Sequence, residues 1–420
     1  MEQYDCLLEV KQEMAGSTID HLISVMVFMG ALLVFISLFN QTLQTAILYQ
    51  RHRYLATKCS DLLDNILLNP GIPADWGKSN VTPVGFGLQD PEFTQYRLSP
   101  FSLMRLQSSV GEPVYYSRTG LTYSNITMGF GNFLLVPYTE AIDYSVVAKL
   151  LGINGTYGFQ LAITPIVTVS IEEMQWKNPL ILSIKVAGVG FPLANARISY
   201  CLLTVSEGGG GQYPSYTVEY GANFTNAQGS VLLKFSNIKN EVSYVFIVYA
   251  YLGGLMGMGY YEHVTYSGSY IIPFIDNFAE GRILIAHSYD VHNIGDTAQV
   301  TYNATFVVLT KSFTLQSIPV ARGNLTYGLG FPYAYVTIPE NVRKNPGILV
   351  ITYRKSTQET GVVLMPWGIS SLAFPAVFGG DPTGQEWVVA DVRQVIVNGI
   401  AYQARLALWS LEGYGVVAKK

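Results

Sequence analysis

One short segment carries the residue types best suited to hold a metal ion. His287, Asp290 and His292 lie within six consecutive positions, and imidazole and carboxylate groups are common ligands of transition metals. We expect a strand over residues 281–291, on which neighbouring side chains alternate between faces, so that His287 points away from Asp290 and His292. His263 is a further ligand candidate from elsewhere in the sequence. We therefore predict ordinary polar residues here, with no metal and no cofactor.

Other reactive residue types occur without the spacing that a reaction needs. Gly208 to Gly211 lack the Lys-Ser/Thr that follows in a phosphate-binding loop, so a hairpin tip is predicted there. No Gly-x-Ser-x-Gly nucleophile elbow occurs, and the carboxylates are scattered along the chain. Cys59 and Cys201 either pair with each other or remain buried free thiols. We predict no enzyme activity and keep a surface hydrolase only as an alternative.

Aromatic residues offer a different kind of site. The chain has 29 Tyr and 5 Trp, and aromatic rings commonly line pockets for small ligands. Trp367, Trp387 and Trp409 are the candidates for a sugar- or solute-binding groove. This alternative requires exposed rings, and burial of these rings in hydrophobic cores would exclude it.

Acceptor sequences for N-glycosylation are over-represented. Seven Asn-x-Thr sequences occur, whereas composition alone predicts roughly one, and such sequences mark surface positions of exported proteins. One of them begins at Asn40, beside an apolar segment. The other six are the glycosylation candidates: Asn80, Asn125, Asn154, Asn223, Asn303 and Asn324.

A membrane-spanning helix is predicted near the N-terminus. Residues 22–39 read LISVMVFMGALLVFISLF, and no Asp, Glu, Lys or Arg occurs between Asp20 and Arg51. Eighteen helical residues rise about 27 Å, which suits the hydrocarbon core of a bilayer. The lipid bilayer is therefore the predicted partner of residues 22–39.

The helical pattern continues beyond the membrane segment. Apolar residues recur at three- and four-residue spacing at Leu48, Leu55, Cys59, Leu62, Leu63, Ile66 and Leu67. Asn69 precedes Pro70, which disfavours helix at the residue before it. We expect one helix over residues 17–69, whose amphipathic second half packs against a folded domain.

The start of this helix resembles a known family of membrane proteins. The sequence AGSTID at positions 15–20, followed by the apolar run, is similar to archaeal type IV pilin-like proteins with class III signal peptides. The resemblance implies a cytoplasmic leader, residues 1–16, that is removed to leave an acidic residue near position five. Cleavage after Ala15 would make Asp20 the fifth residue, and cleavage after Gly16 would make it the fourth.

Two signals bear on the orientation of the chain. Arg51, His52, Arg53 and Lys58 follow the apolar run, and an excess of cations marks the cytoplasmic side. The sequon excess and the low lysine content favour an exterior location instead. We expect a single-pass protein of the cell membrane with its C-terminal bulk extracellular, in which these cations pair with helix carboxylates.

The remaining sequence is typical of β-proteins. Residues 70–171 predict a small α+β unit, with helices beginning at Ser99-Pro100 and over residues 140–151. Residues 263–420 predict a second β-domain, in which Asn398-Gly399 forms a two-residue hairpin.

The segment between them contains a second resemblance. The strand Pro192-Leu-Ala-Asn-Ala196 is followed by the turn Thr225-Asn-Ala-Gln-Gly229. Residues 172–262 thereby resemble bacterial Ig-like and carboxypeptidase-regulatory-like surface modules, which implies a β-sandwich that serves as a scaffold. The uncharged run over residues 242–261 is predicted to be a buried strand and not a second membrane span.

The predicted fold is mainly β with a long N-terminal α-helix, a membrane anchor followed by a small α+β unit and two β-sandwich-like domains. A net charge of −4 gives no basic surface, which excludes nucleic acid as the expected partner. We predict a glycosylated archaeal surface protein with a structural or adhesive role. Its partners would be copies of itself in a pilin-like filament or other cell-surface proteins.

Overall fold

The computed structural model describes the chain in two compact units, residues 1–58 and 59–420. The description covers residues 2–411 except 80, 93–94, 107–109, 128–132, 138–139, 177, 207–212, 237, 239–241, 265–269, 278–279, 294–295, 329, 344, 346, 356–358, 368–375, 386 and 398.

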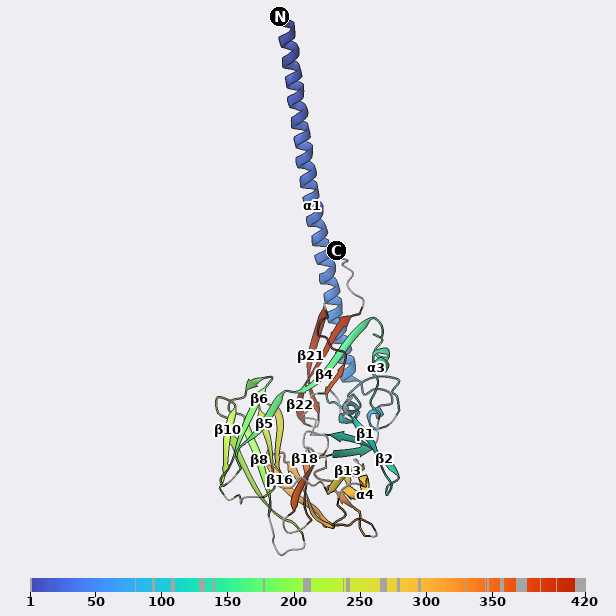
Figure 1. The fold of residues 1–420 in the computed structure, drawn as a ribbon, viewed down its shortest axis with the longest axis vertical. Helices are drawn as coiled ribbons and strands as arrows, with labels where there is room; N and C mark the ends of the chain where they lie inside the picture. Colours follow the sequence, from blue (N-terminus) through green and yellow to red (C-terminus); the bar gives the residue numbers. More distant parts are fainter. Residues whose placement is uncertain are drawn as a thin grey trace. The chain divides into compact units, whose positions relative to one another are not determined.

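A single unbroken helix, α1 (Glu2–Leu68), forms the whole described part of the first unit and continues into the second (Figure 1). Its apolar side chains between Ile19 and Ile47 are exposed on every side. Among the described residues α1 alone is long and apolar enough to cross a membrane. The prediction of one membrane-compatible N-terminal helix is thus confirmed.

α1 ends where the sequence predicts. The helix stops at Leu68, and Pro70 follows after one residue. Gly71 then turns the chain with φ +88°, a conformation that side-chain-bearing residues rarely adopt. The indole Nε1 of Trp76, in the short 3₁₀ helix η1 (Trp76–Lys78), donates to the carbonyl oxygens of Pro70 (3.1 Å) and Gly87 (2.9 Å). The Trp76 ring therefore lies beneath the turn, and its N–H is hydrogen-bonded.

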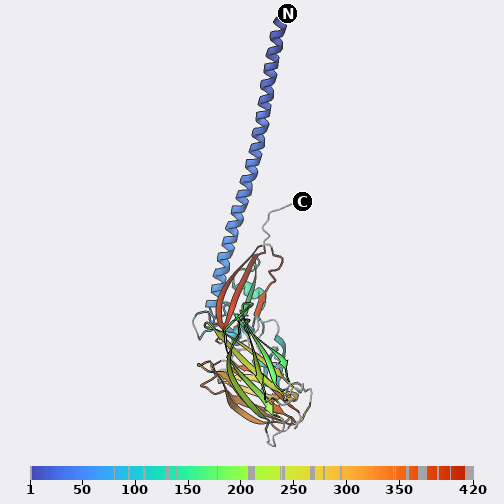
Figure 2. The same ribbon diagram turned by 90° about the vertical axis from the view of Figure 1, so that its left-hand side faces the viewer.

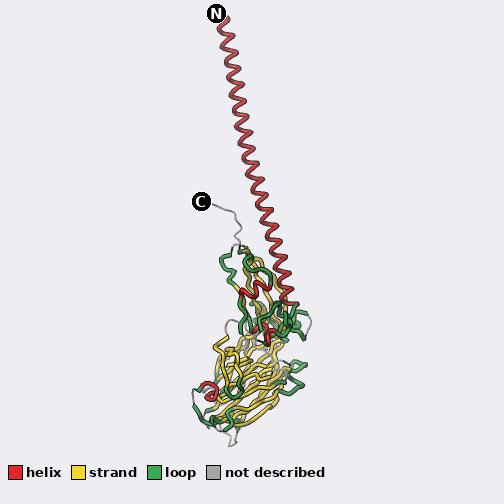
Figure 3. The backbone as a smooth tube through the Cα atoms, turned by 90° about the vertical axis from the view of Figure 1, so that its right-hand side faces the viewer, coloured by secondary structure: helices red, strands yellow, loops and turns green. Residues whose placement is uncertain are grey.

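The described part of the second unit consists mainly of antiparallel strands (yellow in Figure 3), with three short α-helices besides the end of α1 and η1. Those helices are α2 (Pro100–Met104), α3 (Tyr144–Leu150) and α4 (Ser288–His292). Ser99 caps α2 by accepting from Ser102 N, as its sequence position ahead of Pro100 predicts.

One sheet, called here the C-terminal sheet, lies against the last turns of α1. Its strands in spatial order are β20 (Ala376–Gly379), β4 (Tyr157–Pro165), β22 (Ile400–Ser410) and β21 (Val388–Val397). Val397 pairs with Ile400, so the two-residue hairpin is confirmed, and Gly399 has the positive φ that such a turn requires. β4 is followed after one residue by β5 (Val167–Gln175), which belongs to another sheet.

Two further sheets form a β-sandwich over residues 167–263. One contains β10 (Ser230–Phe235), β6 (Leu180–Gly188) and β5 (Val167–Gln175), with β7 (Phe191–Pro192) beside β6. The other contains β12 (Leu255–His263), β11 (Tyr244–Leu252), β8 (Arg197–Ser206) and β9 (Ser215–Phe224). Leu182, Ile184, Leu202 and Phe246 meet in the core between them. The predicted β-sandwich is confirmed.

Of the remaining two sheets, the six-stranded one combines distant parts of the sequence. One contains β16 (Leu315–Leu325), β15 (Val300–Leu309), β18 (Gly347–Arg354) and β19 (Thr360–Trp367). The six-stranded sheet contains β1 (Val110–Tyr116), β2 (Leu121–Thr127), β3 (Phe133–Pro137), β13 (Ile271–Asn277), β14 (Arg282–His287) and β17 (Tyr333–Thr337). Strands expected in the 70–171 unit therefore pair with strands of the 263–420 region.

Some strands are apolar on both faces because the sheets that contain them are covered on both faces. Residues Tyr244 to Ala250 of β11 are all buried, and so are Gly347 to Tyr353 of β18. Alternate residues of β11 point into the sandwich core, while the opposite face of the same sheet packs through β8 against β16 and β19. Figure 2 shows the strands of the second unit from the side. The first half of the uncharged run at 242–261 is thus the predicted buried strand, whereas its second half forms a Gly253-Gly254 turn and the partly buried β12.

Candidate functional site: the junction of α1 with the C-terminal sheet

The last turns of α1 present an apolar face to the folded unit. Cys59, Leu62, Leu63, Ile66 and Leu67 are buried, and they occupy the positions whose spacing predicted an amphipathic helix. Burying each aliphatic side chain contributes about 1.5–3 kcal/mol relative to leaving it in water. This segment is therefore held against the sheet mainly by packing.

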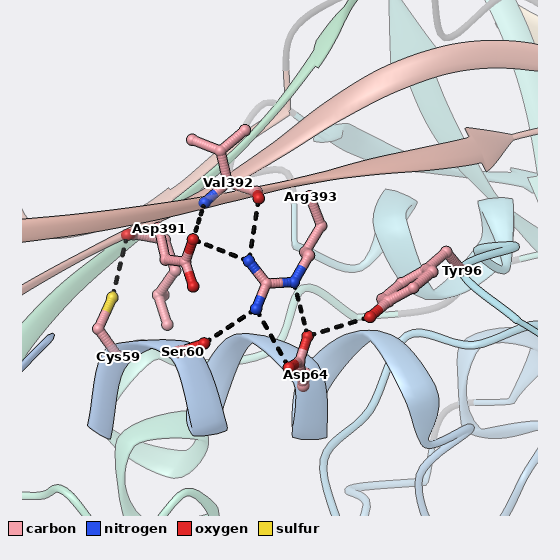
Figure 4. Close-up of polar contacts among 8 residues, drawn as sticks. Cys59, Ser60, Asp64, Tyr96, Asp391, Val392 and Arg393 are labelled. Carbon is pink, nitrogen blue, oxygen red and sulfur yellow. Dashed lines mark hydrogen bonds and ion pairs between the residues drawn. The ribbon is translucent and has the colours of Figure 1, made fainter. Parts of the chain in front are cut away.

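Arg393 of β21 lies at the centre of the polar contacts (Figure 4). Its Nε donates to Asp64 Oδ1 at 2.9 Å and its Nη2 to Asp64 Oδ2 at 3.2 Å, which is a two-point pairing of guanidinium with carboxylate. Nη2 also donates to Ser60 Oγ at 2.9 Å, and Nη1 donates to Asp391 Oδ1 at 2.8 Å. The planar fork of arginine suits such an arrangement, whereas the ammonium of lysine does not.

The surrounding groups complete this cluster. Tyr96 donates its hydroxyl to Asp64 Oδ1 at 3.2 Å. Burial alone would raise the pKa of Asp391, but hydrogen bonds from Ser60, from the backbone N–H of Val392 and from Arg393 together lower it. Hydrogen bonding with Asp64 raises the pKa of Arg393 above its usual value. The guanidinium therefore stays charged at every physiological pH and keeps its contacts with both carboxylates.

The thiol of Cys59 adds a weaker contact beside this cluster. Its Sγ donates to the carbonyl oxygen of Leu406 on β22 at 3.3 Å, and burial raises the pKa of the thiol to about 11. Cys201, on β8, is buried too, and burial raises its pKa to about 12. Both cysteines are free thiols, so of the two alternatives open from the sequence the structure has the unpaired one.

The predicted strand over residues 281–291 is wrong beyond His287. β14 ends there because the His287 ring accepts a hydrogen bond from Tyr289 N (3.2 Å), which begins the short helix α4. Asp290 accepts from the hydroxyl of Tyr116 at 2.7 Å and pairs with Arg118 at 3.0 Å. The residues of the predicted cluster therefore have separate roles. His287 caps α4, and Asp290 forms an ion pair with Arg118. Among the described residues no three His, Cys, Asp or Glu side chains are grouped to hold a metal.

Two of the three tryptophans proposed for the alternative binding groove lie in hydrophobic cores. Trp367 and Trp409 are buried, and the indole of Trp367 donates to the carbonyl oxygen of Arg343 at 2.8 Å. Trp387 remains 38% exposed. The hairpin tip predicted at Gly208–Gly211 lies outside the described residues.

The predicted modification sites differ in exposure. Asn154 and Asn223 are exposed, as is Asn40 within α1. Three further acceptor candidates are partly buried within strands: Asn125, Asn303 and Asn324. Asn80 lies outside the described residues. Ala15 and Gly16 lie within α1, and Asp20 is exposed.

Two arginines with structural roles were missed by the sequence reasoning. Arg393 could have been suspected from its position two residues after Asp391, because both charges lie on a strand face whose other residues are apolar. Arg105 carries no comparable signal. It is 3% exposed and donates from Nη1 to the carbonyl oxygens of Trp76 (2.7 Å), Ser79 (3.0 Å) and Val81 (2.8 Å).

Comparison with known proteins gives only distant similarities. No family model and no curated protein matches the sequence. Native E. coli alpha-2-macroglobulin aligns with 65% of this chain at 9% identity and a TM-score of 0.20, and the chain spans 19% of that protein. A two-domain fibronectin type-III segment of chicken tenascin aligns with 49% of this chain and 99% of its own length, at 12% identity and a TM-score of 0.16.

A tandem repeat from the extending region of a large adhesion protein is similar to the same degree. It aligns with 64% of this chain and 58% of its own length, at 11% identity and a TM-score of 0.18. With TM-scores this low, none of these alignments bears on function.

Proposed function

We propose that this chain is a membrane-anchored surface protein with a structural or adhesive role. One observation carries the proposal: α1 runs without interruption from apolar residues that nothing buries to a segment that is fastened into a folded β-unit. Exposed apolar side chains on every side of a helix require lipid or other helices around them. Residues 22–39 are the membrane segment in this proposal.

The bulk of the chain is proposed to be extracellular. The support is the sevenfold occurrence of Asn-x-Thr together with two acceptor residues, Asn154 and Asn223, that the fold leaves exposed. The low charged content of 13% and the fully buried strands agree with a surface scaffold built from stacked sheets.

The pilin-like role is the finer part of this proposal. After cleavage at Ala15 or Gly16, the exposed apolar helix would pack with copies of itself in an archaeal filament, whereas without cleavage it would stay in the bilayer as an anchor. N-terminal sequencing of the native protein distinguishes the two, because a mature chain that begins at residue 16 or 17 requires cleavage.

Membrane fractionation tests the anchor itself. The native chain should sediment with membranes and resist extraction by high salt, and a double variant Leu33→Asp, Phe35→Asp should become soluble. The control is Leu232→Asp, which places the same charge at an exposed apolar position of β10 and should leave the fractionation unchanged. A native chain recovered in the soluble fraction would refute the proposal.

Protease accessibility in intact cells tests the orientation. An added protease should cleave the exterior β-unit while a cytoplasmic marker stays intact. Full protection of the β-unit in intact cells, with cleavage after lysis, would place it in the cytoplasm.

A further inference from the structure

The acceptor sequences for glycosylation are not equivalent in the folded chain. Attachment of a sugar requires that the asparagine Nδ2 be free to react and that the enzyme can reach both the asparagine and the hydroxyl two residues later. Six of the seven sequences have a described asparagine, so the fold itself separates usable acceptors from unusable ones.

Three asparagines lie within strands and are partly buried. Asn303 of β15 is partly buried, and its Nδ2 donates to the carbonyl oxygen of Pro214. The atom that would form the bond to sugar is therefore already used. Asn125 and Asn324 are partly buried in β2 and β16, and the Oδ1 of each is buried.

At two exposed asparagines, the hydroxyl of the threonine two positions later is already hydrogen-bonded within the fold. Asn223 is followed by Thr225, which is 5% exposed and whose Oγ1 donates to Leu193 O (2.6 Å) and accepts from Ala196 N (2.8 Å). The hydroxyl of Thr42, after Asn40, donates within α1 to the carbonyl oxygen of Leu38 at 2.8 Å. In both cases recognition would require local unfolding.

Asn154 meets both requirements. Asn154, Gly155 and Thr156 are all exposed, in the turn that connects α3 to β4. A Cβ built on Gly155 would meet nothing within 4 Å, so there is open space around the turn. Neither the Asn154 nor the Thr156 side chain hydrogen-bonds to any residue that the structure describes, which leaves Nδ2 and Oγ1 available.

We propose that, among the acceptor asparagines that the structure describes, Asn154 is the N-glycosylation site of the folded protein. This inference rests on the proposed exterior location. The donor is a sugar joined through its anomeric carbon to the phosphate of a lipid carrier. The Asn154 Nδ2 forms a bond to that carbon and loses one proton to a base, while the bond from the carbon to the phosphate oxygen breaks and the lipid phosphate leaves with the electron pair.

Glycopeptide mass spectrometry of the protein isolated from its native membrane tests this assignment. The peptide containing Asn154 should carry a glycan and the peptide containing Asn303 should not. Asn154→Gln and Thr156→Ala should each remove the mass of one glycan, and Thr156→Ser should retain it. Asn223→Gln is the matched control at another exposed acceptor and should leave the mass of attached glycan unchanged.

The outcomes separate this inference from the proposed function. A glycan on Asn303, or loss of a glycan in the Asn223→Gln variant, would overturn the assignment. An unmodified protein that external protease cleaves in intact cells would overturn the glycosylation site alone. An unmodified protein that is protected from the protease would overturn the exterior location as well.

Discussion

Arg393 and Asp64 lie 329 positions apart in the sequence, and their side chains pair at two points, with Nε to Oδ1 at 2.9 Å and Nη2 to Oδ2 at 3.2 Å. The pairing connects the last turns of α1 to strand β21. The Arg393 and Asp64 side chains are 25% and 37% exposed, so solvent screens the pair less than a surface ion pair. In the proposed anchor, this pairing would hold the β-unit to the end of the helix.

Replacing Arg393 by Ala should lower the free energy of unfolding of the β-unit by about 1–3 kcal/mol, because Asp64 and Asp391 then lose a shared cation. Arg393→Lys should recover part of this stability, since a lysine cannot reproduce the two-point geometry. Urea denaturation of the detergent-solubilised chain measures both effects.

The matched control is Arg405→Ala on the neighbouring strand β22, where the arginine is exposed. It should change stability by less than about 0.5 kcal/mol. A double-mutant cycle between Arg393→Ala and Asp64→Ala should give a coupling energy of about 1 kcal/mol. Strictly additive effects would show that the two residues do not stabilise each other.

Local signals in the sequence were sufficient to predict where several elements begin, end or turn. Pro70 fixes the end of α1, Ser99 caps α2, and the small residue Gly399 permits the β21–β22 turn. Each of these depends on the conformational preference of one or two residues, which the sequence shows directly.

Non-local pairing was not predictable in the same way. β3 pairs with β13 and β4 with β22, although the expected boundaries put the members of each pair in different domains. Strand order depends on which apolar faces meet, and many strands here are apolar on both faces, so periodicity does not distinguish their neighbours. Arg393 was missed for the same reason, since its partner lies in a helix that only the fold brings near.

Thiol labelling should show that Cys59 and Cys201 are inert in the folded chain. Burial raises the pKa of both thiols, to about 11 and about 12, and only the thiolate reacts with a maleimide. In a Cys6→Ser background at pH 8, we expect no labelling without denaturant and two labels in denaturant. Labelling of the native chain, or a mass that requires reduction before labelling in denaturant, would contradict the structure.

Gly257 should not tolerate a side chain. A Cβ at this position would lie 2.5 Å from the carbonyl oxygen of Val167, because β12 packs directly on β5. Gly257→Ala should destabilise the β-unit by about 2–3 kcal/mol through overpacking. The control is Gly253→Ala in the same hairpin, where φ is +59° but a Cβ meets nothing within 4 Å, so that only a backbone cost of about 1 kcal/mol is expected. Equal effects of the two substitutions would rule out the close packing of β12 on β5.

Glu262 should make stability depend on pH in the range between its unfolded and folded pKa values. Burial raises the pKa of Glu262 from 4.5 to about 7, so the folded state holds this proton more tightly than the unfolded state does. The part of the free energy of unfolding that depends on the protonated Glu262 side chain is complete below about pH 4.5. It is lost as the pH rises to about 7.

Glu262→Gln keeps a neutral group of the same shape and should remove this slope. At pH 8 it should stabilise the chain by about 1–2 kcal/mol, since solvent reaches part of the carboxylate and reduces the effect. Glu219→Gln, at an exposed position of β9, is the matched control and should leave the slope unchanged. Thermal unfolding from pH 4 to pH 8 measures the difference, and an unaltered slope in the Glu262→Gln variant would show that another group is responsible for it.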